Sequence, residues 1–340
     1  MENATPGTRP PAIGGRFVNL DGTTPDKKGW AVLYWALRYR LRDELRQAFT
    51  AFLDLFRREK SWRPPFHPNQ AAALAPDQPH LTWLGHSTFL LRLGGHWVLM
   101  DPVFGHPAWT LWRRAPSGLP PDQLPQIDVV TLSHDHYDHL DLPSLAALKG
   151  EPPIVAPLQM GRYLSRPPGR VGSRRASLGA VIELDWWQSS ERPGLRITLT
   201  PAHHWGMRGL TGRNRTLWGG FIYEGDGITV YFAGDSALQK PVFQAIHQRF
   251  PRIDIAILPI GAYAPSWFMQ AQHMNPEEAA LAYEILGARR FVAMHWGTFS
   301  LSSEPTREPL DRLRACWEKQ GHREEDLWIM DVGGTRSLAG

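Results

Sequence analysis

The sequence predicts an α/β fold in which two β-sheets pack face to face and helices cover them on the outside. Short apolar segments separated by Gly/Pro turns run through the chain from Leu81 onward, as expected for buried strands. Segments with helical spacing of apolar residues fall between the later strands. The 340 residues are 42% hydrophobic and 21% charged, which is typical of a globular protein with a sizeable core.

The expected elements follow from these patterns. The expected strands are Leu81–Trp83, Thr88–Leu93, Trp97–Met100, Ile127–Leu132, Ile154–Val155, Val181–Leu184, Leu195–Thr200, Trp218–Glu224, Thr229–Ala233, Ile255–Pro259 and Phe291–Met294. The expected helices are Leu142–Leu148, Pro241–Arg249, Pro276–Leu286 and Glu308–Lys319.

The first 80 residues differ from the rest of the chain. Residues 1–29 are rich in Gly, Pro and Thr and predict an irregular arm. Trp30–Lys60 carries apolar residues at helical spacing with interleaved arginines, and the next stretch, rich in proline, is typical of a linker. We therefore expect residues 1–80 to form an arm and a helix packed on, or extending, a catalytic domain of residues 81–340.

The composition excludes several classes of protein. A single cysteine, Cys316, rules out an intramolecular disulfide and a thiolate zinc cluster, so any metal must be held by His and carboxylates. There is no apolar run of membrane-spanning length, and the polar start lacks the pattern of a signal peptide. We expect a cytoplasmic or peripheral membrane protein. The net charge of +4 identifies no partner.

Four polar motifs directly follow expected strands, where a sheet fixes the backbone and loops give access. They are Ser133–His139, Pro201–Trp205, Gly234–Ser236 and His295–Gly297. His134 and His136 are two residues apart, so both imidazoles project to one side of an extended segment, and Asp138 and His139 follow at once. Three His and one Asp exceed what a single tetrahedral zinc needs from so short a segment. This pattern indicates two neighbouring metal ions.

The later motifs supply another His, an Asp and a further His, which brings the candidate ligands to seven. Asp235 suits a bridge between the ions, whereas alone it would suit a turn beside Gly234. His295 alone would suit a buried histidine at a strand end. The sequence Pro201–Trp205 offers both His203 and His204.

The order of these ligands resembles the metallo-β-lactamase superfamily. More narrowly, the chain is similar to the family of N-acylphosphatidylethanolamine-hydrolysing phospholipases D and their bacterial relatives. The resemblance extends over about residues 16–300. It is carried by Arg16–Asn19, Trp83–Thr88, Leu124–Asp128, Ser133–Asp141, Pro201–Trp205, Phe232–Asp235, Gln272–Glu278 and Met294–Phe299.

The resemblance implies an αββα sandwich of two mixed β-sheets flanked by helices, with two Zn²⁺ per chain at one edge. It assigns one zinc to His134, His136 and His204 and the other to Asp138, His139 and His295, with Asp235 bridging both. His204 is chosen over His203 because it directly precedes Trp205 in the matching segment. Where this chain has Asp135, the family tends to have Asn, at a position that is not a ligand.

Further residues are expected around the ligands. Asp101 would orient a zinc-bound imidazole, or simply form a turn before Pro102. His86 would line the site or orient a ligand. Besides Asp138 and Asp235, we expect His273 to act in catalysis, at the substrate phosphate or the leaving group, or else to have a structural role before a helix. Two tryptophans are expected near the ligands or the substrate, namely Trp205 and Trp267.

The resemblance implies hydrolysis of N-acylphosphatidylethanolamine to an N-acylethanolamine and phosphatidic acid. Two zinc ions about 3.5–4 Å apart lower the pKa of a shared water, and the hydroxide would attack phosphorus. The partner would then be a phospholipid, with peripheral membrane association through Trp30–Lys60 or Trp267–Met269. A segment such as Trp30–Lys60 is more often a helix packed on its own domain, and Trp267–Met269 also suits the wall of an acyl pocket.

Two alternatives stay open. The same site would suit a soluble phosphodiester, such as a cyclic nucleotide, or a lactone. An RNA-processing nuclease would need a basic surface, for which Arg162–Arg175 is the candidate, but Pro167–Gly169 at its centre favours an exposed loop. We expect no nucleic-acid partner, and the sequence leaves a homodimer open.

Overall fold

The computed structural model describes residues 12–25, 34, 63–68, 77–108, 111–165, 178–209 and 211–339. Trp30–Lys60, apart from Tyr34, and most of the basic segment Arg162–Arg175 lie outside the described residues. The expected lipid-facing helix and the exposed basic loop are therefore not described. The division of the chain at residues 80 and 81 stays a prediction.

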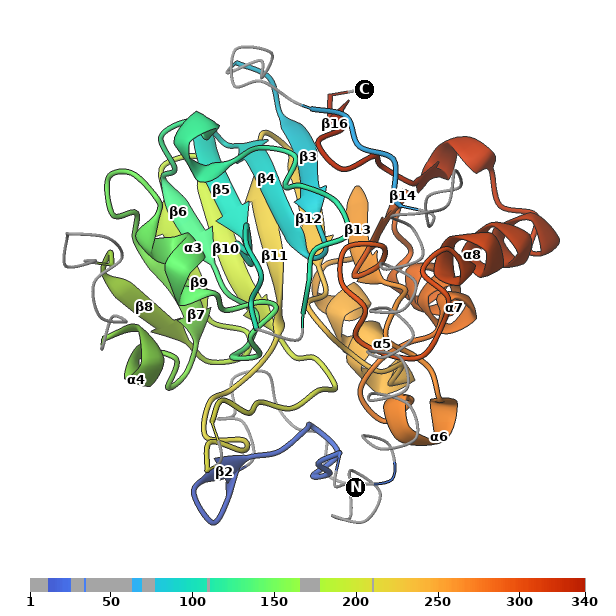
Figure 1. Cartoon of the computed structure of the whole chain (residues 1–340), viewed down its shortest axis with the longest axis horizontal. Helices are drawn as coiled ribbons and strands as arrows, with labels where there is room; N and C mark the ends of the chain where they lie inside the picture. Colours follow the sequence, from blue (N-terminus) through green and yellow to red (C-terminus); the bar gives the residue numbers. More distant parts are fainter. Residues whose placement is uncertain are drawn as a thin grey trace, which may run out of the picture.

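Two seven-stranded sheets pack face to face, with helices on their outer faces (Figure 1). In spatial order, the first contains β16 (Thr335–Ser337), β3 (His80–Gly85), β4 (Thr88–Leu93), β5 (His96–Met100), β6 (Val129–Thr131), β7 (Ile154–Pro157) and β8 (Val181–Leu184). The second contains β15 (Leu327–Trp328), β14 (Arg290–Met294), β13 (Ile255–Pro259), β12 (Ile228–Phe232), β11 (Gly220–Gly225), β10 (Leu195–Thr200) and β9 (Ser189–Arg192).

Both sheets are mixed. From β16 to β5 and from β12 to β9 neighbouring strands are antiparallel. From β5 to β8 and from β12 to β15 they are parallel. The predicted sandwich of two mixed sheets is thus confirmed.

The helices lie on the two outer faces of the sandwich. On the first sheet lie α3 (Leu142–Ala146) and α4 (Gly161–Leu164), and on the second α5 (Lys240–Arg249), α7 (Pro276–Leu286) and α8 (Glu308–Lys319) (Figure 1). Within the second group, α7 packs against α5, α8 and β13. The shorter elements are η3 (Pro121–Gln123), α6 (Ser266–Met269), η4 (Glu324–Asp326) and the hairpin of β1 (Ala12–Ile13) and β2 (Arg16–Phe17).

The sequence of β4 shows why the sheets are buried on both faces. Phe89, Leu91 and Leu93 point into the core between the two sheets, where Phe89 meets Phe232 edge to face with 6.4 Å between ring centroids. Leu90 points the other way, into the core beneath the helices of the first sheet. Because successive side chains of a strand alternate between faces, a strand covered on both sides needs a continuous apolar run.

The strands that the sequence did not predict are short and mostly at the edges. The edge strand β9 reads Ser-Ser-Glu-Arg and carries no apolar pattern. It is a strand because its backbone pairs with β10. The edge strands β15 and β16 have two and three residues, too few for a periodicity to be recognised.

Candidate metal site

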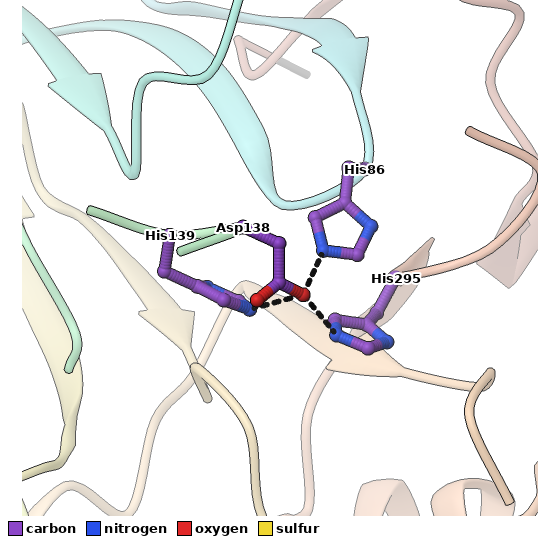
Figure 2. A group of neighbouring side chains, drawn as sticks. All are labelled: His86, Asp138, His139 and His295. Carbon is purple, nitrogen blue, oxygen red and sulfur yellow. Dashed lines mark hydrogen bonds and ion pairs between the residues drawn. The ribbon is translucent and has the colours of Figure 1, made fainter. Parts of the chain in front are cut away.

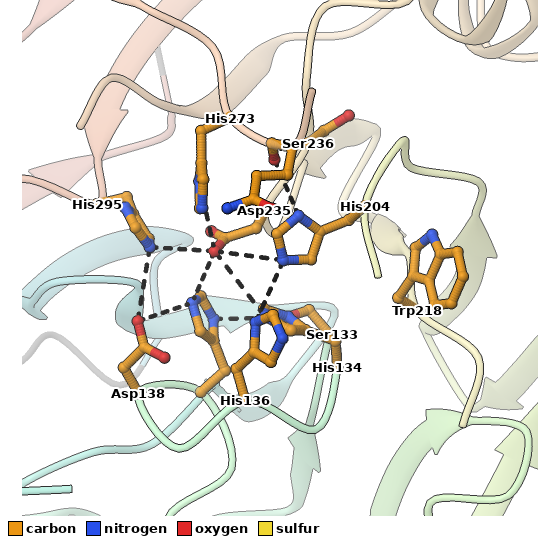
Figure 3. A network of polar contacts seen from close by, with 12 residues as sticks. Ser133, His134, His136, Asp138, His204, Trp218, Asp235, Ser236, His273 and His295 are labelled. Carbon is orange, nitrogen blue, oxygen red and sulfur yellow. Dashed lines mark hydrogen bonds and ion pairs between the residues drawn. The ribbon is translucent and has the colours of Figure 1, made fainter. Parts of the chain in front are cut away.

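The predicted ligands lie at one edge of the sandwich, where both sheets contribute (Figure 3). The segment with His134, His136, Asp138 and His139 follows β6 of the first sheet. His204, Asp235 and His295 follow β10, β12 and β14 of the second sheet. All seven are buried or nearly so. The fold thus brings together side chains that are 161 residues apart at the extremes (134 to 295).

One group consists of His134, His136, His204 and Asp235. His136 Nδ1 lies 2.9 Å from His134 Nε2 and 3.3 Å from His204 Nε2. Nitrogen ligands of a tetrahedral zinc, each about 2.0–2.1 Å from the ion, are about 3.4 Å apart. The three ring nitrogens therefore converge as ligands of one ion would.

A second group consists of His86, Asp138, His139 and His295 (Figure 2). Asp138 Oδ2 lies 3.7 Å from Nε2 of both His139 and His295. It lies 3.1 Å from His86 Nε2, so His86 is placed to donate a hydrogen bond to this carboxylate. His86 thus lies among the expected ligands, where it can orient the Asp138 carboxylate.

The Asp235 carboxylate faces both groups. Its Oδ2 is 3.3 Å from His139 Nε2 and 3.1 Å from His295 Nε2. The same oxygen is 3.9 Å from His134 Nε2 and 3.8 Å from His204 Nε2. This is the place that a carboxylate bridging two ions would occupy.

Several buried atoms of the cluster lack hydrogen-bond partners among the described residues. Among them are Asp235 Oδ1, His139 Nε2 and His295 Nε2, although both nitrogens lie within ion-pair distance, 3.3 and 3.1 Å, of Asp235 Oδ2. Buried polar atoms are nearly always hydrogen-bonded, because an unpaired one loses its hydration without compensation. Converging imidazole nitrogens and a carboxylate oxygen that lack partners fit a metal site, since a cation would satisfy them together.

The buried histidines of the cluster differ in the direction in which their pKa is shifted. Burial lowers the pKa of His134 and His204 well below the usual value, so both are neutral, the form that binds metals. Burial also opposes protonation of His139 and His295, but the charges of Asp235 and Asp138 outweigh it. They raise the pKa of His139 well above its usual value and that of His295 to about 9.

The pKa values of the carboxylates Asp235 and Asp138 are shifted downward instead. Burial favours the neutral acid, yet the neighbouring imidazoles His295 and His139 hold the pKa of Asp235 well below its usual range. His139, His295 and His86 do the same for the pKa of Asp138. The site therefore combines carboxylates that favour the ionised form, two imidazoles that favour the protonated form, His139 and His295, and two that favour the neutral form, His134 and His204.

Asp101 lies directly behind His139. His139 Nδ1 donates to Asp101 Oδ2 at 2.7 Å, which directs its Nε2 toward Asp235. The carboxylate also accepts hydrogen bonds from the backbone N–H and the hydroxyl of Ser133. This is the contact expected of a residue that orients a metal-bound imidazole. Ser133 was not predicted; its position directly before His134 is the signal that would have indicated it.

The segment around His273 bears on the two roles that the sequence left open for this residue, a catalytic one and a structural one before a helix. Asn275 caps α7: its side chain accepts from Glu278 N–H, and Glu278 accepts from Asn275 N–H. The preceding Gln272 carbonyl accepts from His204 Nδ1 at 2.9 Å. His273 Nδ1 lies 3.8 Å from Asp235 Oδ2. Hence His273 both precedes a helix and lies beside the ligands.

The backbone is strained at several residues of the site. His86, Asp101 and His295 have positive φ values of 55°, 39° and 60°, which side-chain-bearing residues rarely adopt. Gly234 also has a positive φ, and a Cβ there would lie 2.8 Å from the Gly219 carbonyl oxygen. Such strain collects at functional sites, where the surrounding structure holds it in place.

The remaining predicted residues lie outside the two groups. His203 Nδ1 is 3.9 Å from Asp21 Oδ2, and His203 belongs to neither group of candidate ligands. The Trp205 ring packs edge to face against His136, with centroids 4.7 Å apart. Trp267 is exposed on α6, and its ring lies 5.9 Å from that of Tyr34. Asp135 accepts a hydrogen bond from the Thr216 hydroxyl.

Comparison with known proteins identifies the family. Residues 96–296 match the model of the β-lactamase superfamily domain. An N-acyl-phosphatidylethanolamine-hydrolyzing phospholipase D of Caenorhabditis elegans is 36% identical over 266 residues, 74% of each chain. An uncharacterized protein of Mycobacterium tuberculosis is 36% identical over 325 residues, 90% of this chain and 79% of that one.

Among solved structures, an isothiocyanate hydrolase from gut bacteria of Delia radicum has the same fold. Its TM-score is 0.61 at 22% identity, over 76% of this chain and 98% of the other. The His/Asp cluster described above could hold the metal that a metal-dependent hydrolase of the β-lactamase superfamily requires. The chain belongs to the metallo-β-lactamase superfamily.

Proposed function

We propose that the protein is a zinc-dependent phosphodiester hydrolase that holds two Zn²⁺ and cleaves N-acylphosphatidylethanolamine to an N-acylethanolamine and phosphatidic acid. The observation that carries the metal site is the position of Asp235 Oδ2, 3.1–3.9 Å from four imidazole nitrogens in two groups. The substrate is proposed from the similarity to the C. elegans phospholipase D.

We assign His134, His136 and His204 to one ion and Asp138, His139 and His295 to the other, with Asp235 shared. Bound zinc ions supply Lewis acidity and activation of water for hydrolysis of a phosphodiester. The chain's own part is to hold the ligands: Asp101 fixes the ring of His139, and the Gln272 carbonyl fixes that of His204. Both contacts select the tautomer in which Nε2 is free to bind.

His273 is our candidate for proton transfer to the leaving group. In an ester of N-acylethanolamine the departing alkoxide needs a proton. The His273 ring lies beside those of His204 and His295, with centroids 5.2 and 5.4 Å away, so it borders both metal groups. Within this proposal Asp138 and Asp235 stay ionised and do not donate the proton, because the imidazoles lower their pKa.

A phospholipid substrate calls for contact with a membrane surface. In the described part of the chain, no helix is both long and apolar enough to cross a bilayer. Exposed aromatic side chains do occur, among them Trp112, Trp267 and Tyr137, which directly follows the ligand His136. We propose peripheral membrane association and no nucleic-acid partner; the homodimer stays a prediction.

The substrate is tested by comparing two phosphodiesters. Vesicles containing N-acylphosphatidylethanolamine should yield N-acylethanolamine and phosphatidic acid, with turnover at least tenfold above that of a soluble bis-aryl phosphodiester, a difference of about 1.4 kcal/mol. Mass spectrometry of the products measures both reactions, and Asp138→Asn serves as the inactive control. Turnover of the soluble ester alone would assign the site to another substrate.

The adjacent histidines provide a matched pair of variants. His204→Ala should weaken zinc binding at one site by roughly a hundredfold or more, because a direct ligand is lost and even an outer contact contributes about 10–100-fold. His203→Ala should change zinc affinity by less than about threefold, since His203 lies outside both groups. Competition with a chromophoric chelator measures both affinities. The reverse order would show that the wrong imidazole was assigned.

Zinc uptake by the metal-free protein should release protons. At pH 7.5 His139 and His295 are protonated, because their pKa values are raised, and each must lose its proton to bind. Calorimetry in buffers of different ionisation enthalpy should therefore show release of at least about two protons, and apparent affinity should rise between pH 7.5 and about pH 9, where His295 loses its proton. Uptake without proton release at pH 7.5 would contradict this charge state.

A further inference from the structure

The segment Arg16–Pro25 packs against the loop that carries His204. Phe17 N–H donates to the Asn214 carbonyl at 2.9 Å, and the Arg16 guanidinium donates to the Arg213 carbonyl at 3.1 Å. In return, the Arg213 guanidinium donates to the Pro25 carbonyl. This segment precedes the matched family domain, residues 96–296, by about 70 residues (25 to 96). One of its residues nevertheless forms a hydrogen bond with the backbone of the candidate ligand His204.

Asn19 makes the contact. Its side chain is fully buried, and its Oδ1 accepts from the backbone N–H of His204 at 3.0 Å and from the indole of Trp218 at 3.1 Å. Asn19 is itself held in a turn, because its N–H donates to the Thr23 carbonyl and its carbonyl accepts from Gly22 N–H. The amide oxygen is therefore presented at a fixed position.

The two donors, the His204 backbone N–H and the Trp218 indole, differ in whether they have an acceptor besides Asn19. The Trp218 indole has a second acceptor, the Ala202 carbonyl at 3.1 Å. Among the described residues, Asn19 Oδ1 is the one acceptor of the His204 N–H. Loss of the Asn19 side chain would thus leave the backbone of the ligand, and not the indole, with a buried donor that lacks a partner, which is costly.

We infer that Asn19 is a positioning residue of the metal group His134, His136 and His204, and that the segment Arg16–Pro25 is a structural part of the active site. The His204 ring is fixed at Nδ1 by the Gln272 carbonyl, and its backbone is fixed by Asn19. Trp218, the other donor to Asn19, lies beside His204 in Figure 3. The inference rests on the proposed metal site.

The test compares Asn19→Ala with Trp218→Phe in the full-length chain. The first variant removes the acceptor of His204 N–H. The second removes the other hydrogen bond of the same oxygen and some buried volume, so it controls for a general loss of stability. Binding of Co²⁺ and Zn²⁺ is measured by chelator competition, and the visible spectrum of bound Co²⁺ reports the ligand geometry.

Asn19→Ala should weaken one of the two metal sites by roughly 10–100-fold, the range seen when an outer contact of a ligand is lost, and should change the Co²⁺ spectrum. The other site should change by less than about threefold. Trp218→Phe should lower the unfolding temperature but keep both affinities within about threefold. Wild-type affinities in Asn19→Ala, or an equal loss in Trp218→Phe, would overturn the inference.

Asn19→Asp provides a rescue and covers the case in which Asn19→Ala does not fold. It keeps an oxygen at the position of Oδ1, and the Nδ2 that it removes has no partner among the described residues. Its affinity for both metals should exceed that of Asn19→Ala, or stay within about threefold of wild type where the alanine variant is unfolded. A folded Asn19→Asp that loses 10–100-fold would contradict the inference. Absence of metal binding in the wild type would instead refute the proposed function.

Discussion

The Asp235 carboxylate oxygen that faces two sets of imidazoles is the contact on which the rest of the site depends. A buried anion is costly unless opposite charges surround it, and here His139 and His295 lie within 3.3 Å of Oδ2. Without metal, their protonation offsets the charge of Asp235 and Asp138. Two dications, as proposed for this site, would take over that role, and the imidazoles would lose their protons on binding them. The buried negative charge of Asp235 therefore favours the binding of a cation in the cluster.

Holding these ligands places demands on the fold. Both sheets end at the same edge, so four loops reach one point while their strands stay packed in the core. The strained backbone at His86, Asp101 and His295 is tolerated because buried hydrogen bonds hold the same segments, such as those from Ser133 to Asp101 and from His86 N–H to the Thr298 hydroxyl. Outer contacts then fix the direction of two rings, that of His139 by Asp101 and that of His204 by the Gln272 carbonyl.

The buried strands and the ligand cluster could be predicted from sequence because their signals are local. An apolar run such as Phe89–Leu91 has to be buried, and His134 to Asp138 lie within one short segment. Strand β9 and the strand β16 could not be predicted, because their pairing comes from neighbouring strands and not from their own residues. The contacts of His86 with Asp138 and of Asn19 with His204 join residues 52 and 185 positions apart, and no local pattern indicates them.

The central claim, that Asp235 joins two metal sites, is tested most directly by counting bound metal in the wild type and in Asp235→Asn. Inductively coupled plasma mass spectrometry of the zinc-loaded, gel-filtered proteins should find close to two zinc ions per wild-type chain. Asp235→Asn, which keeps the shape but removes the shared charge, should retain clearly less zinc. A folded wild type without zinc, or a variant that keeps both ions as tightly as the wild type, would contradict the account.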